Sequence, residues 1–84
     1  MTRPLSLVLQ IIIPHAELVS SFYGGADRAR DLGDITCEEC GLAHRALKRV
    51  FLDKGQSGMS FTARKEMVKR QIKRCKENEG MPCR

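Results

Sequence analysis

The sequence has 84 residues, enough for one small domain and too few for a paired Rossmann unit or a barrel. Hydrophobic residues make up 42% of the chain and charged residues 30%, so the composition is that of a folded protein and excludes a disordered one. The formal net charge is +5.

The two halves of the chain carry opposite net charge. Residues 1–44 contain three basic and six acidic residues, a net charge of −3. Residues 45–84 contain twelve basic and four acidic residues, a net charge of +8. A basic half of this kind favours a polyanionic partner such as nucleic acid. The alternative interpretation is a solvated helix face without a ligand.

The first predicted element is an amphipathic helix over residues 4–23. Its apolar side chains recur at helical spacing, at Leu5, Val8, Leu9, Ile12, Ala16, Val19, Phe22 and Tyr23. We expect Pro14 to kink or break this helix, and the pair Gly24-Gly25 to end it. The β-branched run at residues 5–13 also permits a strand, which would have to pair across a dimer. The Leu5–Tyr23 stripe could equally form a homodimer seam.

The apolar run LSLVLQIII raises the question of a signal peptide or a membrane span. The run has nine residues, whereas a helix that crosses a bilayer needs about 20. The residues that follow, Pro14-His15-Ala16, make a poor signal-cleavage site. We therefore expect no membrane association and an intracellular protein, either cytoplasmic or nuclear.

A capping box marks the start of the next predicted helix. After a polar connector at residues 26–34, Thr36 stands three residues before Glu39, so each side chain can accept a hydrogen bond from the other residue's backbone N–H. We expect a helix from Cys37 to about Leu52. Its apolar side carries Cys37, Cys40, His44, Leu47 and Phe51.

The last predicted helix covers residues 61–78 and follows a loop at residues 53–58. Its apolar side carries Phe61, Val68, Ile72 and Cys75, and Gly80 ends it. Because the loop is short, we expect the two later helices to pack as an antiparallel hairpin. The predicted fold is therefore a single all-α domain in which residues 37–84 form a helical hairpin.

The four cysteines predict a zinc site that clamps this hairpin. In an antiparallel register Cys75 lies at the same end as the C-x-x-C pair, and Cys83 can return to that end. The predicted zinc ligands are Cys37, Cys40, Cys75 and Cys83; in the fallback set His44 replaces Cys37. Two alternatives stay open: small core cysteines, and thiols that form disulfides or a redox pair.

The last helix is also the basic one, and it predicts nucleic-acid binding. Aromatic residues that could stack on bases are scarce, which disfavours single-stranded RNA and leaves duplex DNA, in transcription regulation. Helix, loop and basic helix have a loose likeness to a helix-turn-helix unit, although this loop is longer than the usual turn. The residues predicted to contact nucleic acid are Arg64, Lys65, Lys69, Arg70, Lys73, Arg74 and Lys76.

The alternative function is a protein adaptor or inhibitor that docks the same cations on an acidic partner surface. We find no set of nucleophile, base and orienting residue, no carboxylate dyad and no glycine-rich phosphate loop in the sequence. His15 lies in a separate element and is expected to be a surface or packing residue. We therefore expect a binding protein and not an enzyme.

Overall fold

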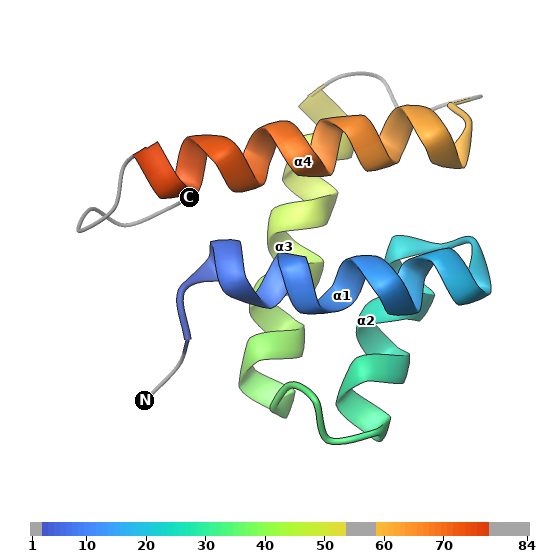
Figure 1. The fold of residues 1–84 in the computed structure, drawn as a ribbon, viewed down its shortest axis with the longest axis vertical. Helices are drawn as coiled ribbons and strands as arrows, with labels where there is room; N and C mark the ends of the chain where they lie inside the picture. The colour runs from blue at the N-terminus through green and yellow to red at the C-terminus, as the bar shows by residue number, and fades with distance from the viewer. Residues whose placement is uncertain (1–2, 54–58, 78–84) are drawn as a thin grey trace.

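The structure is a computed structural model that describes residues 3–53 and 59–77. These residues form four helices (Figure 1), which are α1 (Leu5–Val19), α2 (Phe22–Asp31), α3 (Cys37–Asp53) and α4 (Phe61–Glu77). The described residues contain no strand, so the predicted all-α class is confirmed. The strand considered for residues 5–13 is helical instead.

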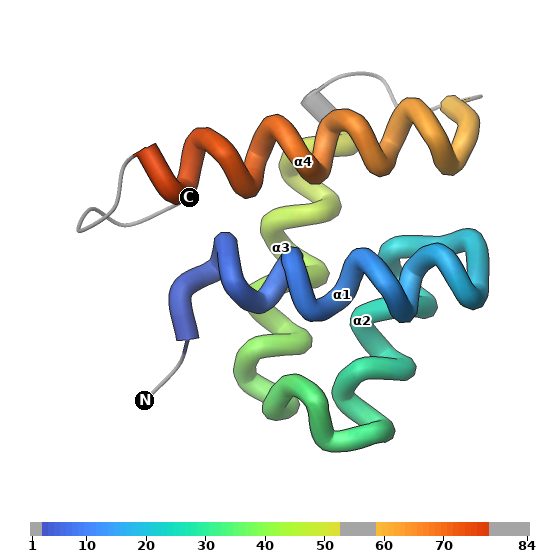
Figure 2. The backbone as a smooth tube through the Cα atoms, in the orientation of Figure 1, coloured from blue at the N-terminus to red at the C-terminus, as the bar shows by residue number. Residues whose placement is uncertain are grey.

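The helices form two antiparallel pairs that cross each other. α1 and α4 lie side by side and run in opposite directions, while α3 crosses the direction of both (Figure 2). α2 turns away from α1 by 108° and packs beside the first half of α3, which runs the opposite way (Figure 1). α1 and α3 each pack against all three other helices, and α1 makes the more extensive contacts of the two.

The predicted pairing of the last two helices is wrong in its geometry. α4 does not run back along α3 but crosses its C-terminal end and lies along α1 (Figure 1). The physical reason is that α1 is apolar on more than one side, and the ten residues of α2 cannot cover it alone. α4 therefore buries its Val68 and Ile72 in the common core that α1 occupies.

The apolar stripe of the first predicted helix forms the core of the domain. Val8, Leu9, Ile12 and Ala16 are each at most 1% exposed. Phe22 lies beyond the end of α1 and stacks on Phe61 with ring centroids 5.1 Å apart. The stripe proposed as a dimer seam is thus largely occupied by contacts within the chain.

The boundary between α1 and α2 lies four residues earlier than predicted. α1 ends at Val19, Ser20 adopts a left-handed conformation with φ of 55°, and the hydroxyl of Ser21 accepts a hydrogen bond from Gly24 N–H. Pro14 sits on the exposed side of α1 and does not end the helix. The break expected at Pro14 or at the glycines therefore lies at Ser20, where the backbone turns left-handed, and at Ser21, a favoured residue type for the start of a helix.

The glycines predicted to end a helix instead let two helices touch. A Cβ atom on Gly25 would lie 2.6 Å from the backbone N and Cα of Ala16. No side chain fits at that distance, so the backbones of α1 and α2 approach each other as closely as they do only because residue 25 is glycine. This contact fixes the position of α2 on α1.

We expect Gly25→Ala to lower the free energy of unfolding by about 1–3 kcal/mol, because the added methyl group overpacks the α1–α2 contact. Urea denaturation followed by circular dichroism measures the change. Gly41→Ala is the matched control: nothing lies within 4 Å of a Cβ at that position in α3. It should stabilise the protein by about 0.5–1 kcal/mol. A Gly25→Ala protein as stable as the wild type would contradict the contact.

The start of α3 is the predicted capping box, and the structure confirms it. Glu39 N–H donates to the Thr36 hydroxyl at 3.0 Å, and Thr36 N–H donates to the Glu39 carboxylate at 2.8 Å. The Glu39 side chain is only 2% exposed. Arg3, which precedes α1, binds both oxygens of the Glu39 carboxylate, through Nε at 2.8 Å and Nη2 at 2.9 Å.

These contacts control the ionisation of Glu39. The Arg3 guanidinium, and then the Thr36 N–H, hold the pKa of the Glu39 carboxyl far below its ordinary value of 4.5. Arg3 also donates to the carbonyl oxygen of Asp34, so the residues before α1 are tied to the connector and to α3. The folded state therefore stabilises the charged form of the Glu39 carboxyl.

The protein should lose stability in acid. Because folding lowers the Glu39 pKa, the unfolded chain binds this proton more tightly, and the free energy of unfolding falls as the pH drops below 4.5. Glu39→Gln should destabilise the protein at neutral pH and weaken the pH dependence between about pH 5 and about pH 3. Urea titrations across this range measure both effects.

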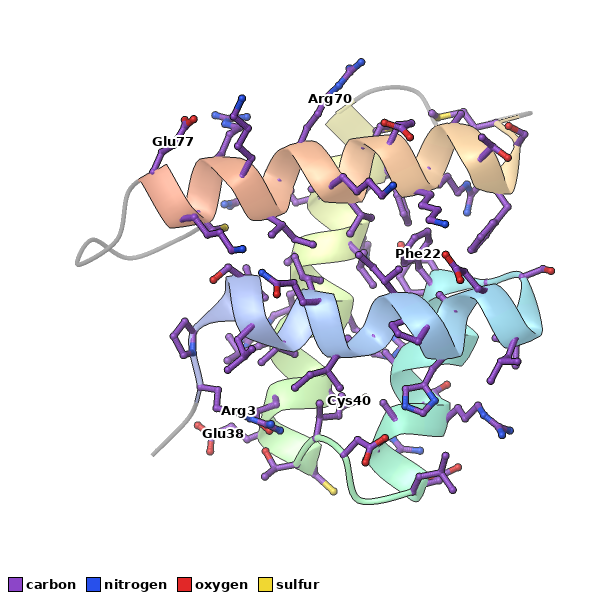
Figure 3. The ribbon with its side chains drawn as sticks, in the orientation of Figure 1. Arg3, Phe22, Glu38, Cys40, Arg70 and Glu77 are labelled. Atoms are coloured by element: carbon purple, nitrogen blue, oxygen red, sulfur yellow. The ribbon has the colours of Figure 1, made fainter. Side chains whose placement is uncertain are left out.

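Glu77→Gln is the matched control, because Glu77 is exposed and points away from the body of the protein (Figure 3). It should keep the acid dependence of the wild type. Identical pH dependence in Glu39→Gln and wild type would show that Arg3 does not hold Glu39 in solution.

Candidate functional site

The candidate site is a group of three side chains between α2 and α3. One ligand atom each from Asp27, Cys40 and His44 lie within 4.8 Å of one another, so the group could hold a metal ion. Asp27 Oδ1 is at the centre, 3.0 Å from His44 Nε2 and 3.8 Å from Cys40 Sγ. Among the described residues this is the one group of three or more acidic, histidine or cysteine side chains so arranged.

The antiparallel packing of α2 and α3 brings these residues together. Cys40 and His44 are four residues apart and therefore lie on the same face of α3. Asp27 stands two residues after Gly25, on the part of α2 that faces α3. The site is partly open, because the side chains of Asp27 and His44 are 48% and 36% exposed.

The thiol of Cys40 is the buried member of the group. Its residue is 3% exposed, and this burial raises the pKa of the thiol above its ordinary value. The nearby Arg30 guanidinium opposes that rise, and the Asp27 carboxylate adds to it. A metal ion bound here would have to displace the thiol proton, as metal binding to cysteine does in general.

The imidazole of His44 is held from two sides. Nε2 faces the carboxylate of Asp27, and the ring stacks on Tyr23 with centroids 5.4 Å apart and planes 26° apart. Arg30 also approaches Asp27, with Nη1 3.8 Å from Oδ1. The three ligand atoms therefore lie close together, with a cation beside them.

The structure assembles only part of the predicted ligand set. Cys40 belongs to the group, as does His44 from the fallback set, whereas Cys37 is exposed at the first residue of α3 and lies outside it. Cys75 is buried near the end of α4 and is disulfide-bonded. Cys83 lies outside the described residues.

Cys75 is remote from the group because the predicted hairpin does not form. The C-terminal end of α4 and the N-terminal end of α3 lie on opposite sides of the domain (Figure 1). Cys75 would reach the C-x-x-C pair only if α3 and α4 packed along each other, and α4 packs along α1 instead (Figure 1). The amide of Gln71 donates to the Cys75 sulfur at 3.7 Å, within α4 itself.

Asp27 was missed because residues 26–34 were interpreted as a polar connector. The signal was present: Phe22, Gly25, Ala26 and Ala29 are buried at helical spacing, and all four are small or apolar. The two glycines masked this period, because they were interpreted as a helix end. His15 is the other histidine, and its Nε2 lies 2.7 Å from Asp34 Oδ2 at the surface, away from the candidate group.

The basic residues of α4 separate into two sets. Arg64 lies over the ring of Phe51 at 5.0 Å from its centroid, and Lys65 pairs with Glu17 of α1. These two cations help to pack α4 against the domain. The other five predicted contact residues are exposed: Lys69, Arg70, Lys73, Arg74 and Lys76. Arg70 projects outward from the domain (Figure 3).

Comparison with known proteins gives no relative. No family model matches the sequence, and no curated protein or solved structure is significantly similar to it. In the described part of the chain, no single helix is both long enough and apolar enough to cross a membrane. Function is therefore inferred from the residues themselves.

Metal binding should depend on Asp27 and His44, which with Cys40 form the group, and not on the other three cysteines of the predicted set. Asp27→Asn and His44→Ala should each weaken Zn²⁺ binding at least about tenfold, because each removes one of three ligands. Competition with a chromophoric chelator measures the affinity. Glu66→Gln, which changes an exposed carboxylate on α4 outside the group, is the control and should bind as the wild type does. If Cys75→Ser released the metal and Asp27→Asn did not, the four-cysteine set would be correct.

Proposed function

We propose that this protein binds zinc at Asp27, Cys40 and His44 and binds nucleic acid, duplex DNA in particular, through the exposed face of α4. The observation that carries the nucleic-acid proposal is a run of five exposed cations, Lys69, Arg70, Lys73, Arg74 and Lys76. Transcription regulation is the corresponding cellular role. α4 needs no rearrangement to present these side chains, because its opposite face is already packed on the core.

The density of charge on α4 matches that of a duplex. Residues 69–76 rise by about 10 Å along the helix. Over the same length of axis, B-DNA carries about six phosphate charges on its two strands. Lys69, Lys73 and Lys76 follow one another along the helix at intervals of four and three residues, so they can track a phosphate backbone together.

The side chains on this face favour phosphate contacts over base readout. The one carboxamide of α4, Gln71, is half-buried, and the described N-terminal turn of α4 is packed by Arg64 and Lys65. In helix-turn-helix proteins it is the N-terminal residues of the recognition helix that contact base edges. Cations concentrated in the C-terminal half instead support binding that tolerates many sequences.

The donor set supports zinc at the metal group. Sulfur, imidazole nitrogen and carboxylate oxygen are the ligand types of zinc sites, whereas Mg²⁺ and Ca²⁺ prefer oxygen alone. The ion would join α2 to α3, and α4 contributes no ligand to the group. Zinc therefore supports the fold of the domain, while α4 makes the nucleic-acid contacts.

Nucleic-acid affinity should depend steeply on salt. For Lys69→Gln with Lys73→Gln, the slope of log affinity against log salt should become shallower by about two, since each lost phosphate contact contributes about 0.9. Fluorescence anisotropy with a labelled duplex, titrated at several salt concentrations, measures the slope. The free energy of unfolding should change little, because exposed cations stabilise a fold weakly.

Arg28→Gln with Arg49→Gln also removes two positive charges, from exposed positions on α2 and α3, and is the matched control. Its slope should remain close to that of the wild type. An unchanged slope in a folded Lys69→Gln, Lys73→Gln protein would contradict the proposal. An acidic protein surface would then be the better partner for this face.

A further inference from the structure

We propose that a zinc ion at Asp27, Cys40 and His44 keeps its fourth coordination position open and binds there the oxyanion of a small ligand with an apolar group. This inference rests on the proposed metal site. Three protein ligands with one open position are the arrangement in which zinc binds water or a ligand, whereas structural sites have four protein ligands. In the described residues the group offers three donors.

A hollow next to the group gives the ligand its place. The hollow has a volume of about 290 Å³ and is lined by Tyr23, His44, Arg45, Lys48 and Leu52. His44 belongs to both the metal group and the hollow, so the hollow adjoins the metal group. The volume is near the lower end of the roughly 300–1,000 Å³ of small-molecule sites, so it fits a small ligand.

The hollow combines apolar walls, which would contact an apolar group, with neighbouring cations, which would attract an anion. The Tyr23 ring and the Leu52 side chain supply apolar surface, and Leu52 is 53% exposed. Arg45 and Lys48 supply two cations. An organic phosphate or carboxylate with an aromatic group combines these two features.

The charged residues around the metal-loaded site also favour an anion. Zn²⁺ is neutralised by the carboxylate of Asp27 and the thiolate of Cys40, which leaves no net charge on the metal and its ligands. Arg30 lies 3.8 Å from Asp27 and is partly neutralised by Asp31, whose Oδ1 is 3.2 Å from Nη2. With Arg45 and Lys48 present as well, the surroundings stay cationic.

Among the described residues, Cys37 is the other free cysteine and the candidate for a fourth ligand, and its position argues against this role. It lies seven residues before His44, a rise of about 10 Å along α3. Each zinc ligand must approach the ion within about 2.0–2.3 Å. A single ion bound to Cys37, Cys40 and His44 would therefore strain the first two turns of α3.

The experiment uses the full chain loaded with Co²⁺, whose absorption spectrum reports the number of thiolate ligands and the coordination of the metal. Phenylphosphate is then added as the probe, with inorganic phosphate for comparison. We expect phenylphosphate to change the visible bands of Co²⁺ in a saturable way and to bind more tightly than inorganic phosphate. Cys37→Ser should leave the thiolate-to-metal band and this response unchanged.

Variants of the hollow test the ligand's place. Arg45→Gln with Lys48→Gln should weaken phenylphosphate binding about tenfold, because two cationic partners of the oxyanion are lost. Arg28→Gln with Arg49→Gln, which removes two exposed cations elsewhere on α2 and α3, should leave it unchanged. Unfolding transitions of both variants should match the wild type.

The outcomes separate the two proposals. Failure of Co²⁺ to bind overturns the metal site itself, before any anion is added. Binding of Co²⁺ with a thiolate band that falls in Cys37→Ser, and with no response to phenylphosphate, shows a closed site and overturns the open position alone. A response that Arg45→Gln with Lys48→Gln does not weaken overturns the assignment to the hollow.

Discussion

The contact on which the rest of this structure depends is the one between Gly25 and Ala16. It brings the backbones of α1 and α2 together at a distance that excludes any Cβ on residue 25. α2 can then pack against both α1 and the first half of α3. Asp27, two residues further along, is thereby placed 3.0 Å from His44 of α3. A steric requirement at one glycine thus determines whether the candidate metal group exists.

A second set of contacts holds the N-terminal end of α3. The Arg3–Glu39 pair and the Thr36 cap fix the first turn of α3, and Cys40 is the residue that follows Glu39. The ion pair is also buried on the Glu39 side, so removing Arg3 would leave a carboxylate without its partner away from water. The position of the first turn of α3 and the ionisation of Glu39 therefore both depend on Arg3, which precedes α1.

Features that depend on neighbouring residues along the chain could be predicted from the sequence. Features that depend on contacts between distant residues could not. The capping box of Thr36 and Glu39 and the periods of the last two helices are local, and the structure reproduces them. Gly24 and Gly25 have the local signature of a helix end, but their role is set by Ala16, which the sequence pattern does not reveal. The hairpin failed for the same reason: the apolar surface of α1, not the loop before Phe61, determines where α4 packs.

The uneven charge of the chain takes on a structural meaning in this fold. Several carboxylates of the acidic half are engaged within the domain: Glu39 with Arg3, Asp34 with His15, Asp27 with His44 and Glu17 with Lys65. Glu17, in the acidic half of the chain, forms an ion pair with Lys65, which lies on the packed side of α4. The cations from Lys69 to Lys76 lie beyond this pair and face solvent. The fold therefore leaves five exposed cations on α4 away from the ion pair of Glu17, an arrangement that suits the proposed polyanionic partner.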